Sequence, residues 1–300
     1  HDLQDCRTRR KVFEWVGQAG ESLLDELKHK SEKHQTMTDS PPPRKLARPG
    51  YEGSEAEELA YMLETPEKPS GPTGLTWLGG FKSDMTGTKA SALADWAKAS
   101  SRHLLRFDYY AHGASSGAFR KATIGRWLDD ALAAIDQLAE GPQVLIGSSM
   151  GGWMALLAAL ARPERVKGLV LIAPAPDFTE ELMWKTFSGE IRETLTRDGI
   201  YREPSDYDDE PYEITMKLIE EGRNHLILGK PIPLACPVRI LQGMKDPDVP
   251  WAHAMRLVET LESDDVTVNL SKSGDHRLST PEDIARLTQT IDMLLEEVEG

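Results

Sequence analysis

Short apolar runs alternate with helical patterns over most of this chain, and this alternation limits the folds that it can adopt. Several runs are apolar almost throughout, which is typical of strands that helices cover on both faces. The predicted strands are residues 74–79, 103–108, 143–147, 166–173, 238–243 and 266–270, with weaker candidates at 44–48 and 57–62. Apolar stripes at helical spacing predict helices over residues 89–100, 124–139, 150–161, 251–261 and 281–296. The alternation therefore predicts an α/β fold with a mostly parallel central sheet and helices on both faces.

Composition and charge narrow the possible partners. The chain has 300 residues, of which 39% are hydrophobic and 28% charged, enough to bury a core of its own. Its net charge is −14, from 35 basic and 49 acidic side chains. A chain with this charge is not expected to have the basic surface that binding to nucleic acids or anionic lipids requires. The two cysteines form neither a disulfide framework nor a zinc motif, and Cys236 is predicted to lie in a buried strand. We expect a cytoplasmic protein without a membrane span, a nucleic-acid partner or a bound metal.

The first 36 residues differ from the rest of the chain. Apolar residues at helical spacing predict a helix there, and a proline-rich linker follows at Met37. One hypothesis makes residues 1–36 an upstream extension ahead of a natural start at Met37. The other makes them a docking helix that packs on this domain or joins two copies into a homo-oligomer. Residues 37–300 are predicted to form the α/β domain.

One interval, residues 176–235, interrupts the alternation of strands and helices. It carries mixed helical patterns and several aromatic side chains. Ligands bind at the carboxyl edge of parallel sheets, and an insertion after the strand at 166–173 leaves the sheet at that edge. We interpret the interval as a small cap, and the alternative is a crossover helix with a decorated loop.

A candidate nucleophile lies between a predicted strand and a predicted helix. Gly147-Ser148-Ser149-Met150-Gly151 has the pattern G-x-S-x-G, in which a sharp turn lifts the central serine above the sheet. Glycine at both ends lets strand and helix approach closely around that turn. The spacing selects Ser149 rather than Ser148.

A serine nucleophile needs a histidine base, and in this arrangement the base follows the serine and the acid in the chain. His276 lies in a loop between the last predicted strand and helix, on the serine's side of the sheet. His225 lies in the predicted cap, and His253 lies in a helix. Only His276 satisfies both the order and the side.

The predicted acid is Asp246, which comes first after the strand at 238–243. Asp248 is the alternative. Its other possible role is to cap the helix that follows, because aspartate is a favoured N-cap residue. Asp246, His276 and Ser149 would together form a catalytic triad.

Two backbone amides are expected to form an oxyanion hole. One is that of Met150, directly after the nucleophile, and the other is that of Phe81, in the loop after the strand at 74–79. A second loop, residues 108–117, follows the next strand and is predicted to be a turn stabilised by Asp108 and serine hydroxyls. His112 in this loop precedes Ser149 in the chain and is predicted to be structural.

Taken in order, these segments resemble the alpha/beta-hydrolase superfamily over residues 40 to 300. The resemblance rests on Leu78-Gly-Gly-Phe-Lys-Ser-Asp-Met85, Phe107-Asp-Tyr-Tyr-Ala-His-Gly-Ala-Ser-Ser-Gly117, Gly147-Ser-Ser-Met-Gly-Gly152, Leu241-Gln-Gly-Met-Lys-Asp-Pro-Asp-Val-Pro250 and Gly274-Asp-His-Arg-Leu-Ser279. The set is most similar to small bacterial relatives of the mitochondrial palmitoyl-protein thioesterase branch. This implies ester or thioester hydrolysis without a metal or organic cofactor. The oxyanion loop departs from the family's common His-Gly pattern, and residues 1–36 match nothing known to us.

The expected activity is hydrolysis of carboxylic esters of small to medium acyl chains through an acyl-enzyme. Acyl thioesters are the second choice, and transfer of the acyl group to an alcohol or amine is a third possibility. A binding module without activity is disfavoured by the complete triad. Leu182, Met183, Trp184 and Phe187 in the predicted cap suggest an apolar acyl site, although core packing would explain them equally well.

Overall fold

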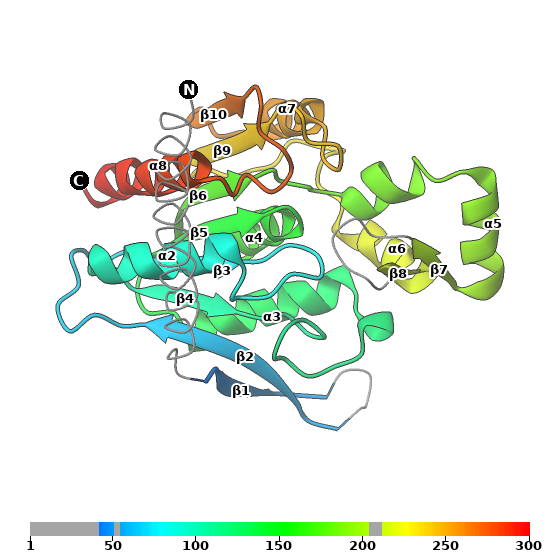
Figure 1. Ribbon diagram of the computed structural model, residues 1–300, viewed down its shortest axis with the longest axis horizontal. Helices are drawn as coiled ribbons and strands as arrows, with labels where there is room; N and C mark the ends of the chain where they lie inside the picture. Colours follow the sequence, from blue (N-terminus) through cyan, green and yellow to red (C-terminus); the bar gives the residue numbers. More distant parts are fainter. Residues whose placement is uncertain (1–41, 51–54, 204–211) are drawn as a thin grey trace, which may run out of the picture. The chain divides into compact units, whose positions relative to one another are not determined.

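A computed structural model describes residues 42–50, 55–203 and 212–300, in which a central sheet lies between layers of helices (Figure 1). The eight strands of this sheet have the order β1-β2-β4-β3-β5-β6-β9-β10. They are β1 (Arg44–Arg48), β2 (Glu57–Glu64), β3 (Gly74–Leu78), β4 (Leu104–Phe107), β5 (Gln143–Ser148), β6 (Val166–Ile172), β9 (Val238–Gly243) and β10 (Val266–Ser271). Strand β2 pairs antiparallel with β1 and β4, and the other pairs are parallel. The predicted mostly parallel sheet is confirmed.

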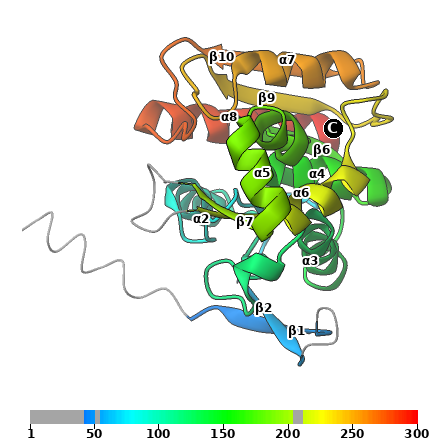
Figure 2. The ribbon, with the colours of Figure 1, turned by 90° about the vertical axis from the view of Figure 1, so that its right-hand side faces the viewer.

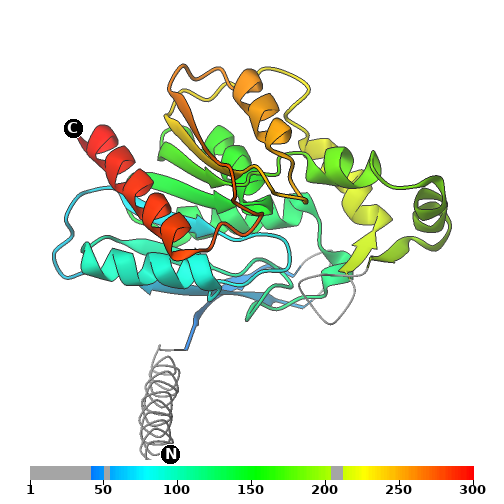
Figure 3. The ribbon, with the colours of Figure 1, turned by 45° about the horizontal axis from the view of Figure 1, so that its top comes forward.

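Helices cover both faces of the sheet because its central strands alternate buried side chains between two cores. Leu145 of β5 packs in one core and its neighbours Val144 and Ile146 pack in the other. The second core is covered by α2 (Thr88–Ala99) and α8 (Pro281–Glu299), which lie on one side of the sheet in Figures 1 and 3. The first core holds buried residues of α3 (Ile124–Gln137), α4 (Met150–Ala161) and α7 (Trp251–Thr260).

Most predicted elements match the observed ones within three residues. Cys236 is an exception: it is half-buried, and it precedes the start of β9 at Val238 instead of lying in the strand. The short 3₁₀ helix η3 (Phe119–Lys121) was not predicted. Residues 1–36 lie outside the described residues, so both hypotheses about them stay predictions. Within the described parts of the chain, every helix is too short or too polar to cross a membrane.

Residues 176–235, which we call the insertion, leave the sheet after β6 and return to it at β9. The insertion contains the single π-helical turn η4 (Thr179–Trp184), α5 (Gly189–Asp198), α6 (Met216–Gly222) and the 3₁₀ turn η5 (Arg223–His225). It also contains an antiparallel hairpin of β7 (Ile200–Glu203) and β8 (Tyr212–Thr215), which the sequence pattern did not predict. A small core of its own is made by Phe187, Leu195, Ile214 and Ile219. In Figure 1 the parallel strands point toward the insertion, and Figure 2 shows it in front of their ends.

The start of the insertion and a segment near its end meet at one buried side chain. The Asp177 carboxylate accepts hydrogen bonds from the backbone N–H groups of Ile227, at 2.9 Å, and Leu228, at 2.8 Å. Asp177 has a φ of 58°, which is unusual for a residue other than glycine. Burial raises the pKa of this carboxyl group, and the two amides act in the opposite direction. Asp177 therefore joins the start of the insertion, next to the sheet, to a segment near its end.

Candidate active site

Ser149 lies on a strained turn between β5 and α4. Its backbone has φ 54° and ψ −116°, outside the helix that begins at Met150. The neighbouring strand β6 stabilises this strained conformation, because the Ser149 N–H donates to the Ile172 carbonyl at 2.9 Å. A Cβ atom added to Gly151 would clash with the Leu78 carbonyl oxygen, and one added to Gly147 would clash with Gly151. Both glycines are therefore required for the close packing that raises the serine.

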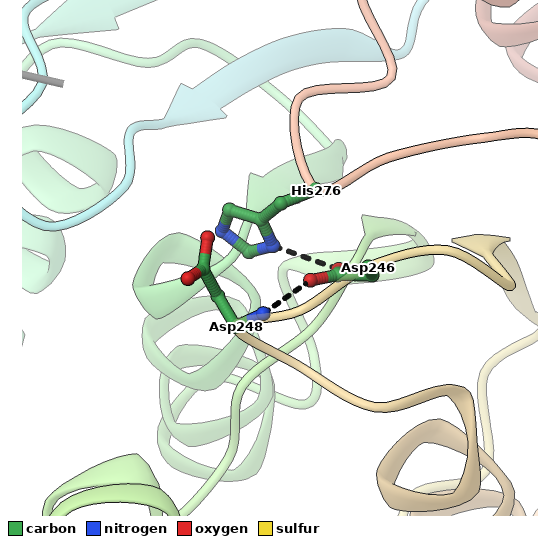
Figure 4. A group of neighbouring side chains, drawn as sticks. All are labelled: Asp246, Asp248 and His276. Atoms are coloured by element: carbon green, nitrogen blue, oxygen red, sulfur yellow. Dashed lines mark hydrogen bonds and ion pairs between the residues drawn. The ribbon is translucent and has the colours of Figure 1, made fainter. Parts of the chain in front are cut away.

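The structure brings His276 and Asp246 to Ser149, although the three residues are far apart in the chain. His276 Nε2 lies 3.1 Å from Ser149 Oγ. Its Nδ1 lies 2.8 Å from Asp246 Oδ2, as Figure 4 shows. The Asp246 side chain is fully buried, whereas the imidazole keeps 19% of its surface exposed. The geometry is that of a hydroxyl, an imidazole and a carboxylate in a hydrogen-bonded series.

Asp246 is held by the loop that carries it. Its Oδ1 accepts hydrogen bonds from the N–H groups of Asp248, at 2.9 Å, and Val249, at 2.8 Å. The amide of Gln242 donates to Oδ2 at 3.3 Å. These donors orient the carboxylate toward His276 and leave Oδ2 able to accept the hydrogen bond from the imidazole.

Asp248 lies beside the same imidazole but in a different setting. Figure 4 shows its exposed carboxylate next to the His276 ring, while its backbone supports Asp246. The predicted alternative role as a helix cap is wrong, because the N-cap position of α7 is occupied by Pro250.

Asp246, Asp248 and His276 each offer one atom within 4.8 Å of the others, a spacing that a divalent cation can bridge. The hydrogen bond between Asp246 and His276 needs a proton between them, whereas metal ligation needs both atoms deprotonated. The hydrogen bond therefore disfavours metal binding by these three residues.

The other histidines occupy different places. His253 Nε2 lies 2.8 Å from the Pro176 carbonyl oxygen, and burial lowers its pKa. His225 pairs with Glu221 at 2.7 Å within the insertion. His112 is 3% exposed and contacts the loop after β3.

The segments that carry the two predicted oxyanion amides both adjoin Ser149. Met150 begins α4, and the first N–H groups of a helix have no acceptor within it. A Cβ atom built on Gly80 would lie 3.6 Å from Ser149 Cβ, so the residue before Phe81 adjoins the serine. Gly80 to Ser83 form a tight turn, in which the Ser83 N–H donates to the Gly80 carbonyl at 3.2 Å.

A pocket of about 1020 Å³ opens at Ser149 and His276. Leu182, Met183 and Phe187 of the insertion are among its lining residues. Trp184 lies outside this lining, and its ring contacts the Arg192 and Arg223 guanidinium groups at 5.6 and 5.1 Å. The expectation that Trp184 contacts an acyl group therefore has no support in the residues that line the pocket.

Two charged residues support the site in ways that the sequence did not predict. Lys89 was not singled out, and Asp108 was expected only to stabilise its own turn. Lys89 of α2 donates hydrogen bonds to the Arg277 carbonyl and to Ser279 Oγ, so it holds the segment directly after His276. Burial lowers the pKa of Lys89 to about 8. Asp108 accepts hydrogen bonds from the N–H groups of Met85, at 2.7 Å, and Ala114, at 2.8 Å, and thus joins two loops. Only tertiary contacts reveal these roles.

The fold and the serine–histidine geometry define a class of protein, the alpha/beta hydrolases with a serine at the nucleophile turn. A family model described as serine aminopeptidase, S33, matches residues 83–203. The human mitochondrial palmitoyl-protein thioesterase ABHD10 is 40% identical over 241 residues, which cover 80% of this chain and 77% of that protein. This chain belongs to the alpha/beta-hydrolase family, as its motifs predicted.

Solved structures agree with this membership. A hydrolase from Agrobacterium vitis S4 shares 45% identity with a TM-score of 0.79, covering 85% of this chain and 99% of that one. The mouse alpha/beta hydrolase domain-containing protein 10 shares 37% identity with a TM-score of 0.77, covering 86% of this chain and all of that one. The expectation of a cytoplasmic location is not confirmed by the ABHD10 relatives, which are named as mitochondrial.

Proposed function

We propose that this protein is an acyl hydrolase that cleaves carboxylic esters or thioesters through a covalent acyl-enzyme. The observation that carries the proposal is the 3.1 Å approach of His276 Nε2 to Ser149 Oγ at the wall of a large pocket. This distance is within hydrogen-bond reach, as required of a general base and its nucleophile.

In the proposed first half-reaction, Ser149 Oγ attacks the substrate carbonyl carbon while His276 Nε2 takes the hydroxyl proton. Asp246 orients the imidazole and stabilises its positive charge. The tetrahedral oxyanion accepts hydrogen bonds from the amides of Phe81 and Met150, each worth about 3 kcal/mol of the barrier. The intermediate then collapses, and His276 gives its proton to the departing alkoxide or thiolate.

In the second half-reaction, His276 takes a proton from a water molecule, which attacks the acyl carbon. A second tetrahedral intermediate forms in the same hole and releases Ser149 and a carboxylic acid. If an alcohol or amine enters instead of water, the same steps give acyl transfer.

The pocket supports an acyl group of considerable length. Side chains of the insertion supply apolar walls beside the serine, including Leu182, Met183 and Phe187. A pocket of this size is at the upper end of those that bind small molecules. The motifs alone favoured carboxylic esters, but the relatives named as palmitoyl-protein thioesterases raise thioesters to equal standing.

The direct test is labelling with a fluorophosphonate probe, which reacts with an activated serine. We expect Ser149→Ala to abolish labelling, and the neighbouring Ser148→Ala variant, used as a matched control, to retain it. An unlabelled wild-type protein, or label that persists in Ser149→Ala, would favour a binding module and overturn the proposal.

The second test distinguishes ester substrates from thioester substrates, and hydrolysis from acyl transfer. Esters and thioesters of the same acyl chains are compared by kcat/KM over increasing chain length, and the products are identified with and without added alcohol or amine. Free carboxylic acid as the only product supports hydrolysis, whereas a new ester or amide supports acyl transfer.

A further inference from the structure

His112 lies behind the loop that carries the Phe81 amide. Its Nε2 accepts a hydrogen bond from the Lys82 N–H at 3.0 Å, and its Nδ1 lies 3.0 Å from the Tyr110 carbonyl oxygen. The ring is 3% exposed. His112 therefore connects the loop at 108–117 to the residue that follows Phe81.

These two contacts define one tautomer of the imidazole. A backbone N–H can only donate, so Nε2 must carry a lone pair toward Lys82. A carbonyl oxygen can only accept, so Nδ1 must carry the proton toward Tyr110. The ring is thus neutral, and burial lowers the pKa of His112 to about 4 in agreement with this state.

The contact with Lys82 supports an unfavourable backbone conformation. In the turn from Gly80 to Ser83, Lys82 is the third residue and has a φ of 55°, whereas Phe81 is not in the left-handed region. A turn with positive φ only at its third residue is of type II, which prefers glycine there. Lysine would favour a flipped Phe81–Lys82 peptide with negative φ. That flip would turn the Lys82 N–H away from His112.

We propose that His112 is a positioning residue for the oxyanion hole, holding the Gly80–Ser83 turn so that the Phe81 amide faces the substrate at Ser149. The inference rests on the proposed function, because it assigns His112 a part in stabilising the oxyanion of that reaction. Without the bond to Lys82, the Phe81–Lys82 peptide gains a second orientation. The adjoining Gly80–Phe81 peptide, which carries the Phe81 N–H, then loses its fixed direction.

The rival explanation is simple core packing. The His112 ring contacts Trp127 and Phe119 with centroid distances of 5.3 and 5.6 Å, and Phe81 contacts the same two rings. A packing role predicts losses of stability that follow side-chain volume. A positioning role predicts losses of transition-state binding that follow the hydrogen-bond acceptor.

Two variants of similar size separate these roles. His112→Gln places an amide oxygen near the position of Nε2 and can still accept from Lys82. His112→Asn places its amide near Nδ1, so it can bond to Tyr110 but not to Lys82. We expect kcat to fall about 30-fold in His112→Asn, less than the 10²- to 10³-fold effect of removing an oxyanion donor, and to stay within about 3-fold in His112→Gln.

The deciding readout is inhibition by a trifluoromethyl ketone, which forms a tetrahedral oxyanion with the serine. In His112→Asn this inhibition weakens in parallel with kcat/KM, while KM and inhibition by the product carboxylic acid stay constant. Equal kcat in both variants and the wild type, or equal weakening of inhibitor and product, overturns the proposal. An inactive wild type instead overturns the proposed function and this inference with it.

A rescue experiment makes the test independent of damage to the core. Glycine tolerates positive φ, so Lys82→Gly added to His112→Asn is expected to restore kcat about 5-fold. Should His112→Asn fail to fold, wild-type protein labelled with ¹⁵N-histidine provides the readout. A protonated Nδ1 and unprotonated Nε2 support the inference, and a protonated Nε2 overturns it.

Discussion

The α/β body and the insertion are built by different means. The body buries whole strands, such as β5, between two extended cores, and its turns hold Ser149, Asp246 and His276 within hydrogen-bond distance. The insertion has a small core of buried apolar residues and a short hairpin, and most of the side chains that it contributes to the pocket wall are apolar. A rigid body suits chemistry that requires fixed distances, and a lightly packed insertion suits a wall that changes with the ligand.

The largest expected effect separates two aspartates within the body. Asp246→Asn keeps the shape of the buried carboxylate but removes its charge, so we expect kcat to fall about 10⁴-fold. Asp248→Asn changes an exposed side chain beside the same ring, and we expect a loss of less than about 10-fold. Steady-state kinetics of the two variants, with circular dichroism as a control for folding, make the comparison. Equal losses would remove the distinction between the two carboxylates.

The next effect concerns acid stability of the body. The pKa of His112 is about 4 in the folded protein and 6.5 in the unfolded chain, so between these values only the unfolded chain takes up the proton. The contribution of His112 to the free energy of unfolding is fully present above pH 6.5. It falls by about 3 kcal/mol as the pH drops toward 4. Urea unfolding at about pH 7 and about pH 5 should show a smaller decrease for His112→Gln than for the wild type. An identical decrease in both proteins would contradict this assignment.

The smallest effect belongs to the insertion. Met183→Ala removes an apolar side chain from the pocket wall, and we expect kcat/KM for long acyl chains to fall about 10-fold. Acetyl substrates should be little affected, because they do not reach that wall. Trp184→Leu is the matched control on the adjacent residue, which lies outside the lining. If Trp184→Leu also lowers kcat/KM more for longer acyl chains, then Met183 is not distinguished from Trp184 as part of the wall that contacts the acyl chain.

Sequence patterns predicted the body well and the insertion poorly, for physical reasons. The central strands of the body, such as β5 and β6, are apolar almost throughout and are separated by amphipathic helices, so their period and ends are clear. Strands β7 and β8 have four residues each, with charged side chains among them, and give too short a pattern to recognise. The sequence grouped Trp184 with Leu182 and Met183 as apolar residues of the cap but could not show which of these side chains face the pocket.

In the candidate site, too, some residues could be predicted from local sequence patterns and others could not. G-x-S-x-G and the order of the acid and base depend on local turns, and these led to the three residues that the structure brings together. The contacts of Lys89 with Arg277 and of His112 with Lys82 join segments distant in the chain. Neither a composition nor a spacing encodes such contacts.

The junction at Asp177 has a consequence for how such a molecule can diversify. Because one carboxylate ties the start of the insertion to Ile227 and Leu228, the two ends of the chain between these points stay together whatever that chain is. The entropic cost of closing such a loop grows only slowly with its length. New sequences can therefore be exchanged at this point, altering which molecules are admitted while the reacting groups stay where they are.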